Sequence, residues 1–343
     1  MDLFLQKVTT MNQKLANVCE TFIDNRDEMR RILRSSGIPM HLMGAAVLTA
    51  LGKSADEEKI LQAEKLLKEK ESEDSPIRGS IKSVTTVHMM TADSIEGYYK
   101  DLKRTHDLIQ VNRGGDDEKY YMAAMMMSDK ISDMQDILFL LDRAGLIHEG
   151  MGKTFSSPED KSEYVTASFA AACGIVNTKA FLERVAICEA CLKESGIFES
   201  VPESFSMLLA IQGSDIEPAC KRAVELFESF RMKGMEYESD EEACVVAMLT
   251  ALDMPTDEIV NAIYEADEFL KKRSGFTEGK GCILRHVYAA VLVTIAYAPE
   301  RGVGWLREKI ESDSEVLKRM VLMQSQSVIH IQMEYVDRED LHI

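Results

Sequence analysis

The sequence predicts an all-α protein built as a helical repeat array, and three observations support this prediction. A short segment rich in alanine and other apolar residues recurs seven times along the 343 residues, at intervals of 38 to 44 residues. A regular period of this length is typical of stacked helical arrays. Each such segment is followed by a longer, more charged segment, and glycine followed by an apolar residue recurs where helices should end. We therefore expect about seven antiparallel helix pairs, arranged as an α/α superhelix or solenoid.

The N-terminal residues show the spacing of an amphipathic helix. Val8, Met11, Leu15, Val18 and Phe22 lie on one helical face, because neighbouring members of this set are three or four residues apart. This pattern predicts a helix that extends to about residue 33. We expect residues 1–36 to form an N-terminal helical cap, and residues 37–343 to form a single continuous helical-repeat domain with a closing C-terminal helix.

The recurring apolar segments predict the buried helix of each pair. They contain few charged residues, and a helix that is apolar on all sides is normally surrounded by protein. Their cores are residues 44–48, 83–87, 122–126, 167–171, 207–211, 245–249 and 288–292.

The charged segments between them predict the outward helix of each pair. Gly145, Gly196, Gly234 and Gly275 each precede an apolar residue, which is typical of a left-handed helix cap. Ser54 with Glu57 has the spacing of a capping box at a helix start. The expected outward helices are 58–69, 94–110, 132–144, 179–195, 217–233 and 256–274.

Three stretches depart from this alternation of apolar and charged segments. Residues 150–161 and 111–117 are polar and contain glycine, so we expect surface loops there. Residues 314–335 fit both a strand-like alternation and a helical stripe. We favour a closing helix, because an isolated strand would have no sheet to join.

Composition and charge limit the classes of function. The chain carries 40 Lys and Arg against 58 Asp and Glu, a net charge of −18, which disfavours nucleic acid or an anionic membrane surface as a partner. There is no signal-like start and no apolar run long enough to span a bilayer. Seven cysteines, an odd number, do not suggest a disulfide framework. We expect a cytoplasmic protein.

Two motifs resemble ligand sites but have simpler interpretations. Residues 150–154, Gly-Met-Gly-Lys-Thr, resemble the end of a phosphate-binding loop, but Ile147 stands where the full pattern needs glycine. The acidic runs 116–118 and 240–242 could suggest metal binding, yet carboxylates also favour the first turn of a helix. We expect a loop at residues 150–154 and helix starts at the two acidic runs.

Cysteine, histidine and methionine residues supply no convergent catalytic set. Cys188 and Cys191 have the spacing of a metal-binding pair, but no second pair exists and Cys173 should lie too far away. We expect core packing for these thiols. The four methionines at 122 and 125–127 could fill gaps or form an adaptable peptide-binding surface. The sequence predicts no catalytic, cofactor-binding or metal-binding residue.

The chain resembles an uncharacterised bacterial family, domain of unknown function 4003. The resemblance is carried by the pair spacing, inner segments such as residues 121–124, helix ends such as residues 192–198, and the closing segment 323–329. These features are architectural. The resemblance implies a cytoplasmic bacterial protein without an assigned activity, and it supplies no catalytic residue.

Two functional hypotheses follow. The first is a non-catalytic scaffold whose concave surface binds a protein or peptide, either as a structural partner or as a sensor. The second is an enzyme or small-molecule binder built on a closed α/α toroid with a central cavity. The arrangement of His88, His286, Arg78 and Arg285 should separate them, because convergence of these side chains in one pocket with shifted pKa values would favour the enzyme.

Overall fold

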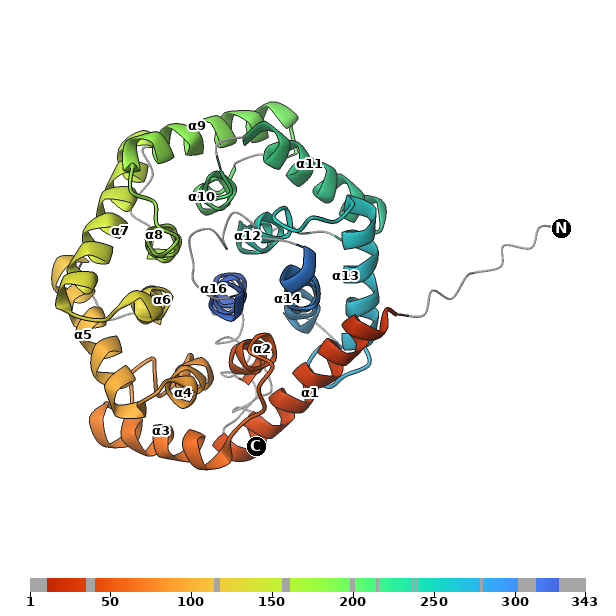
Figure 1. Ribbon diagram of the computed structural model, residues 1–343. Coiled ribbons are helices and arrows are strands. Elements are labelled where there is room, and N and C mark those ends of the chain that lie inside the picture. The colour runs from red at the N-terminus through yellow and green to blue at the C-terminus, as the bar shows by residue number, and fades with distance from the viewer. Residues whose placement is uncertain are drawn as a thin grey trace.

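The fold consists of α-helices arranged in two concentric rings around a central helix (Figure 1). The computed structural model describes residues 11–34, 41–113, 118–155, 161–197, 201–213, 216–235, 237, 240–277, 280–301 and 313–326. These residues contain 15 α-helices and one short 3-10 helix. The all-α class is therefore confirmed.

The outer ring is built from amphipathic helices. In α11, for example, Ile216, Cys220, Ala223, Phe227 and Phe230 form a buried stripe, while the opposite side carries charges. This stripe is what a helix at the surface of a core requires. The outer helices are α1 (Gln13–Leu33), α3 (Glu57–Lys70), α5 (Ile95–Arg113), α7 (Met134–Phe155), α9 (Thr178–Ser195), α11 (Ile216–Met232) and α13 (Thr256–Leu270).

The inner ring is built from the apolar segments, which are buried almost all round. In α6, every residue from Tyr120 to Met127 is buried. Such helices have no polar face, because the outer ring covers one side and the centre of the molecule the other. The inner helices are α2 (Leu42–Ala50), α4 (Lys82–Thr91), α6 (Glu118–Met127), α8 (Lys161–Ala172), α10 (Glu203–Ile211), α12 (Asp240–Leu249) and α14 (Lys280–Arg301).

The ring is closed by α1, which packs against α13 and α14 (Figure 1). The rings of Phe22 and Tyr288 stack at a centroid distance of 5.5 Å. Arg26 Nη1 donates a 3.0 Å hydrogen bond to the carbonyl oxygen of Ser274. The open question between solenoid and toroid is thus answered in favour of a closed ring.

The centre of the ring is occupied by α16 (Asp313–Gln326), which packs against α2, α12 and α14. Leu317, Met320 and Met323 are buried there. Gln324 Nε2 donates a 3.0 Å hydrogen bond to Oγ1 of Thr294, which lies on α14. A helix is confirmed for residues 313–326 of the predicted closing helix, but it fills the centre of the ring instead of closing it. The remaining residues of that prediction lie outside the described part of the chain.

Several expected boundaries are wrong. Gly145 does not end a helix, and residues 150–155 do not form a loop, because α7 continues to Phe155. Met151 is fully buried, so tertiary packing extends the helix past its three glycines, at positions 145, 150 and 152. Likewise, α5 reaches Arg113, so residues 111–113 are helical. The cap of α3 is Asp56, which accepts a hydrogen bond from the backbone N–H of Lys59 in place of Ser54.

Other local expectations are confirmed. Gly196 is the left-handed cap of α9, with a φ of 68° that favours glycine over residues with a side chain. Gly234 and Gly275 also have positive φ angles after helices. The predicted boundary between residues 36 and 37 lies outside the described residues, and α1 is a member of the outer ring between α3 and α13.

Candidate functional site

The four side chains expected to decide between the hypotheses do not share one pocket. His88 lies on α4, where its Nδ1 is 3.0 Å from the Tyr98 hydroxyl. Arg78 donates a 3.0 Å hydrogen bond to the carbonyl oxygen of Glu71. Arg285 and His286 lie together on α14, in a different sector of the ring from α4 (Figure 1). Of these four side chains, the structure therefore brings together only Arg285 and His286.

Arg285 and His286 surround one buried carboxylate on α13. Arg285 Nε donates a 2.5 Å hydrogen bond to Asp267 Oδ1, and His286 Nε2 lies 3.6 Å from the same oxygen. Burial lowers the pKa of His286, and the neighbouring Arg285 lowers it further, while Asp267 opposes both effects. A second hydrogen bond, from Arg285 to the carbonyl oxygen of Phe276, ties this cluster to the turn after α13. We interpret the cluster as an internal support of the ring.

The phosphate-loop resemblance has a structural explanation. Gly150 lies inside α7, and a Cβ at this position would lie 2.2 Å from Leu182 Cδ1 on α9. The glycine therefore permits two outer helices to approach closely. In this helical conformation, residues 150–154 do not form a phosphate-binding loop.

The other motifs lie where simple packing places them. The acidic runs fall at helix starts, since α6 begins at Glu118 and α12 at Asp240, although the side chains at 116, 117 and 240–242 lie outside the described set. The four clustered methionines are fully buried, so they are not an exposed peptide-binding surface. Within the described part of the chain, no group of three or more metal-binding side chains is placed to hold an ion.

The cysteine arrangement was only partly predicted. Cys188 and Cys191 lie on one face of α9, as expected, but their neighbour is Cys220 of α11. The Cys220 sulfur lies 4.0 Å from the carbonyl oxygen of Cys188. No sequence pattern predicts this contact, because it depends on how α9 and α11 pack.

A larger polar network lies between α3, α5 and α6. Tyr99 donates a 2.6 Å hydrogen bond from its hydroxyl to Glu71 Oε1. Lys103 Nζ donates a 3.0 Å hydrogen bond to the Tyr121 hydroxyl and lies 3.7 Å from Glu71 Oε2. His106 stacks flat on Tyr121, with ring centroids 3.7 Å apart. Because residues 99, 103, 106 and 107 lie on one side of α5, a single helix face presents most of the network.

The pKa shifts in this network follow from burial and from the neighbouring charges. Burial raises the pKa of Tyr99, and its hydrogen bond to Glu71 adds to the effect. Burial also raises the pKa of Tyr121. Desolvation would lower the pKa of Lys103, but its interactions with Tyr121, Glu71 and Asp107 outweigh it and raise the pKa. All three groups therefore stay protonated near neutral pH, and none is poised as a general base.

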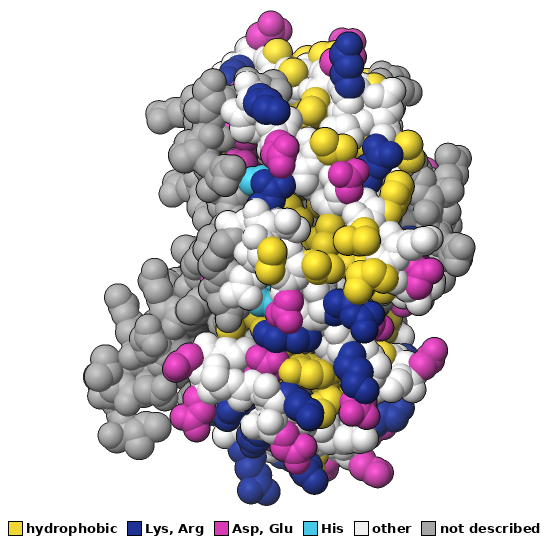
Figure 2. All heavy atoms as spheres, turned by 90° about the vertical axis from the view of Figure 1, so that its left-hand side faces the viewer, with side chains coloured by type: hydrophobic (Ala, Val, Ile, Leu, Met, Phe, Trp, Pro, Cys, Tyr) yellow, Lys and Arg dark blue, Asp and Glu magenta, His cyan; other side chains and the backbone are white. Residues whose placement is uncertain are grey.

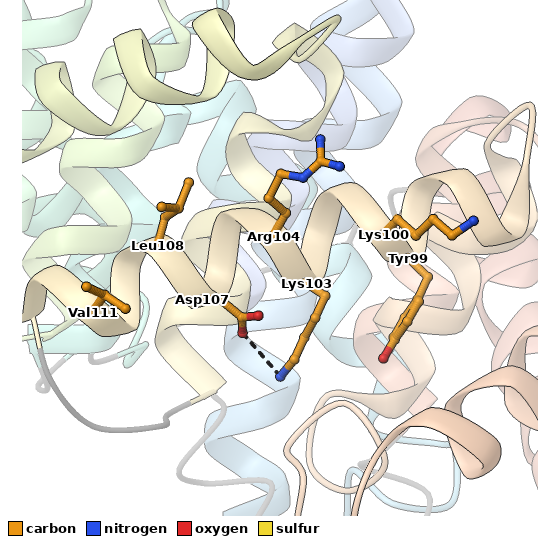
Figure 3. A pocket seen from close by; sticks show the side chains of 7 residues that line it. All are labelled: Tyr99, Lys100, Lys103, Arg104, Asp107, Leu108 and Val111. Atoms are coloured by element: carbon orange, nitrogen blue, oxygen red, sulfur yellow. Dashed lines mark ion pairs between the residues drawn. The ribbon is translucent and has the colours of Figure 1, made fainter.

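The solvent side of this network opens into a hollow of about 470 Å³ on the flank of α5 (Figure 3). It combines cationic groups with aliphatic ones. Lys103 also pairs with Asp107 at 3.4 Å, as drawn in Figure 3. The residues lining the hollow are Tyr99, Lys100, Lys103, Arg104, Asp107, Leu108 and Val111.

The next outer helix of the ring, α7, exposes several apolar side chains (Figure 1). The ends of the two helices are joined by an ion pair between Arg113 of α5 and Glu149 of α7, at 3.2 Å. Figure 2 shows this side of the molecule, where hydrophobic side chains gather near the middle with Lys and Arg beside them. The guanidinium of Arg143 lies 5.1 Å from the centre of the Phe139 ring. The apolar residues of α7 that are exposed here are Met134, Leu138, Phe139 and Leu146.

Fold and site together define a class: a closed ring of paired α-helices with a filled centre and a mixed basic and apolar outer face. No described helix combines the length and the apolar character that crossing a bilayer requires. The chain belongs to the family described as "Protein of unknown function (DUF4003)", whose model matches residues 27–331. Neither the curated proteins nor the solved structures contain a match to this chain.

Proposed function

We propose that this protein is a non-catalytic binding protein, and that its outer face over α5 and α7 binds an acidic, amphipathic helix of a partner protein. The observations that carry the proposal are the cationic hollow on α5 and the exposed apolar side chains of α7, the next outer helix of the ring (Figure 1). We call this surface the α5–α7 face and define it by the hollow residues Tyr99, Lys100, Lys103, Arg104, Asp107, Leu108 and Val111 together with Met134, Leu138, Phe139 and Leu146.

The shape of the hollow favours a protein segment over a small molecule. All of its lining residues come from one helix, α5, so it has a single wall and is open to solvent. Pockets for small ligands usually enclose about 70–90% of the ligand surface. A helix laid along α5 and α7 would cover the exposed apolar side chains of α7 instead, in the manner of a helix in a groove.

Charge supports an acidic partner. The whole chain has a net charge of −18, so most of its surface repels an acidic segment. On the α5–α7 face, Lys100, Lys103, Arg104 and Arg143 lie near the apolar residues, and three of them pair with carboxylates of α5, namely Glu96, Asp107 and Asp101. Opposite charges around an apolar centre fix the orientation of a partner and raise its association rate.

The closed ring changes where a partner could bind. The concave surface expected for an open superhelix would be the inside of the ring, and α16 occupies that position. The alternative, an enzyme or small-molecule binder with a central cavity, needs the same space. The outer surface is therefore the better location for binding, and a repeat array that presents its outer helices is the form of scaffold we favour.

The test uses two sets of synthetic helical peptides with identical apolar faces, one with Glu and the other with Lys at the polar positions. Isothermal titration calorimetry should detect binding of the Glu peptides. The double variant Leu138→Ser/Phe139→Ser should weaken that binding about tenfold or more, as expected when anchor side chains are lost.

The matched control is Ile187→Ser, because Ile187 of α9 is as exposed as Phe139, at 52% each, but lies outside the α5–α7 face. This variant should bind the Glu peptides as the wild type does. Equal binding of Glu and Lys peptides, or an equal loss in the Ile187 variant, would contradict the proposal.

A further inference from the structure

Three cysteines from two outer helices meet at one point of the ring. Cys188 and Cys191 are one turn apart on α9, and Cys220 faces them from α11, which packs against α9. The Cys220 sulfur lies 4.0 Å from the Cys188 carbonyl oxygen and within hydrogen-bonding reach of both other thiols. Other described cysteines, such as Cys19, Cys173 and Cys244, lie on different helices. We call these three residues the thiol cluster.

The three thiols differ in exposure. Cys188 is fully buried, Cys220 is 3% exposed, and Cys191 is only partly buried. Cys191 therefore lies on the solvent side of the thiol cluster, with Cys220 directly behind it. A small oxidant that arrives from solvent meets this pair first.

The electrostatic environment separates their roles. Hydrogen bonds from Cys188 and Cys191 lower the pKa of Cys220, although burial opposes them. The pKa of Cys191 is raised, chiefly by burial. A thiolate reacts with peroxides far faster than a thiol, so the lowered pKa favours Cys220 over Cys191 as the first of the two to react.

We propose that the thiol cluster is an oxidation site, at which hydrogen peroxide converts Cys191 and Cys220 into a disulfide that links α9 to α11. The Cys220 thiolate attacks one peroxide oxygen, and the O–O bond breaks. The departing hydroxide takes up the proton that Cys220 released on ionisation, so the products are a Cys220 sulfenic acid and a water molecule. The Cys191 sulfur then attacks the Cys220 sulfur. The S–O bond breaks, the Cys191 proton joins the departing hydroxide, and a second water is released. Both sulfurs are oxidised and one peroxide is reduced.

Cys188 is assigned a supporting role. It lies farther from solvent than Cys191, and burial together with its hydrogen bond to Cys220 raises its pKa. In the proposed reaction, its thiol stabilises the Cys220 thiolate. The site is unrelated to the α5–α7 face, since α9 and α11 form another part of the outer ring (Figure 1).

The experiment treats the reduced full-length protein with hydrogen peroxide, blocks remaining thiols with N-ethylmaleimide, and maps the peptides by mass spectrometry without reduction. Cleavage after Glu189 separates Cys188 from Cys191, so the cross-linked partner can be identified. We expect a cross-linked peptide that contains Cys191 and Cys220. The intact protein should lose the mass of two hydrogens, a readout that needs no variant.

Three variants sharpen the test. Cys191→Ser should abolish the cross-link and leave a Cys220 sulfenic acid that dimedone traps. Cys220→Ser should abolish both the cross-link and the dimedone adduct. Cys173→Ser, which replaces a buried cysteine at the end of α8, should leave the cross-link unchanged. Circular dichroism and size-exclusion chromatography verify that each variant is folded.

Two results would overturn the proposal. One is a wild-type protein that keeps both thiols reactive toward N-ethylmaleimide after peroxide treatment. The other is a cross-link that joins Cys220 to Cys188, or that persists in Cys191→Ser, because the reacting partner would then be the wrong cysteine.

Discussion

Arg285 and Asp267 form a buried ion pair between α14 and α13, with side chains 10% and 8% exposed and a 2.5 Å distance from Nε to Oδ1. Removing one member of a buried pair leaves the other charge without compensation. We expect Asp267→Ala to lower the free energy of unfolding by about 3–5 kcal/mol, measured by urea denaturation. The control is Lys179→Ala, which breaks the exposed pair with Glu183 and should cost less than about 1 kcal/mol. Equal effects of the two variants would contradict this interpretation.

Ring closure gives a second prediction. Phe22 is fully buried and stacks on Tyr288, so Phe22→Ala removes apolar contact at the junction of α1 and α14. We expect a loss of about 3–5 kcal/mol in the free energy of unfolding. Glu20→Ala changes only the exposed ion pair with Arg273 at the same junction and should cost less than about 1 kcal/mol. A Phe22 variant as stable as the wild type would show that α1 does not close the ring in solution.

Two glycines should respond to alanine in opposite directions. A Cβ on Gly44 would lie 2.9 Å from the carbonyl oxygen of Ser83, a backbone atom of α4 that cannot move away easily. Gly44→Ala should therefore destabilise the protein by about 1–3 kcal/mol. Gly152 lies in α7 with no atom within 4 Å of its Cβ position, and Gly152→Ala should stabilise by up to about 1 kcal/mol. Thermal denaturation of the two variants distinguishes them, and a stabilised Gly44 variant would refute the close packing of α2 on α4.

The stability of the protein should fall at mildly acidic pH because of His286. Burial holds the pKa of His286 below its ordinary value of 6.5, so the unfolded chain binds this proton more readily than the folded one. The stability that follows from the lowered pKa of His286 is fully present above about pH 6.5. This stability is lost as the pH falls toward the pKa of His286 in the folded protein. Asp267, Arg285 and Tyr237 surround the imidazole and stay as they are in His286→Gln. Urea midpoints measured from about pH 8 to about pH 5 should fall more steeply for the wild type. If the urea midpoints of the wild type and of His286→Gln fell in parallel with pH, His286 would not be the source of the pH dependence.

The helices could be predicted from the sequence because their signals are local. The period of apolar segments placed all seven inner helices, and Gly196, Gly234 and Gly275 marked real left-handed turns. The helix end predicted at Gly145 is wrong. Contacts with neighbouring helices such as α8 and α9 stabilise α7 beyond this residue. Local signals also left open whether the array closes, since closure depends on residues that are far apart in the chain.

The candidate site was harder to predict for the same reason. The spacing of Tyr99, Lys103 and Asp107 on one helix face is visible in the sequence. Their partners Glu71 and Tyr121 come from other elements, and only packing brings them within hydrogen-bonding distance. The candidate site residues in the sequence included His88 and His286, and these two histidines lie in separate parts of the ring.

The hydrogen bond between Arg26 and Ser274 joins positions 248 residues apart, so it cannot form until residue 274 has been synthesised. A ribosome releases the N-terminal helices long before α13, α14 and α16 exist. Until then, α1 lacks the neighbours that cover Phe22, and the inner helices lack the central helix that they surround. Closure over such a sequence separation is intrinsically slow compared with local helix pairing. The nascent chain therefore passes through an incomplete ring with exposed apolar surfaces, the kind of species that chaperones bind.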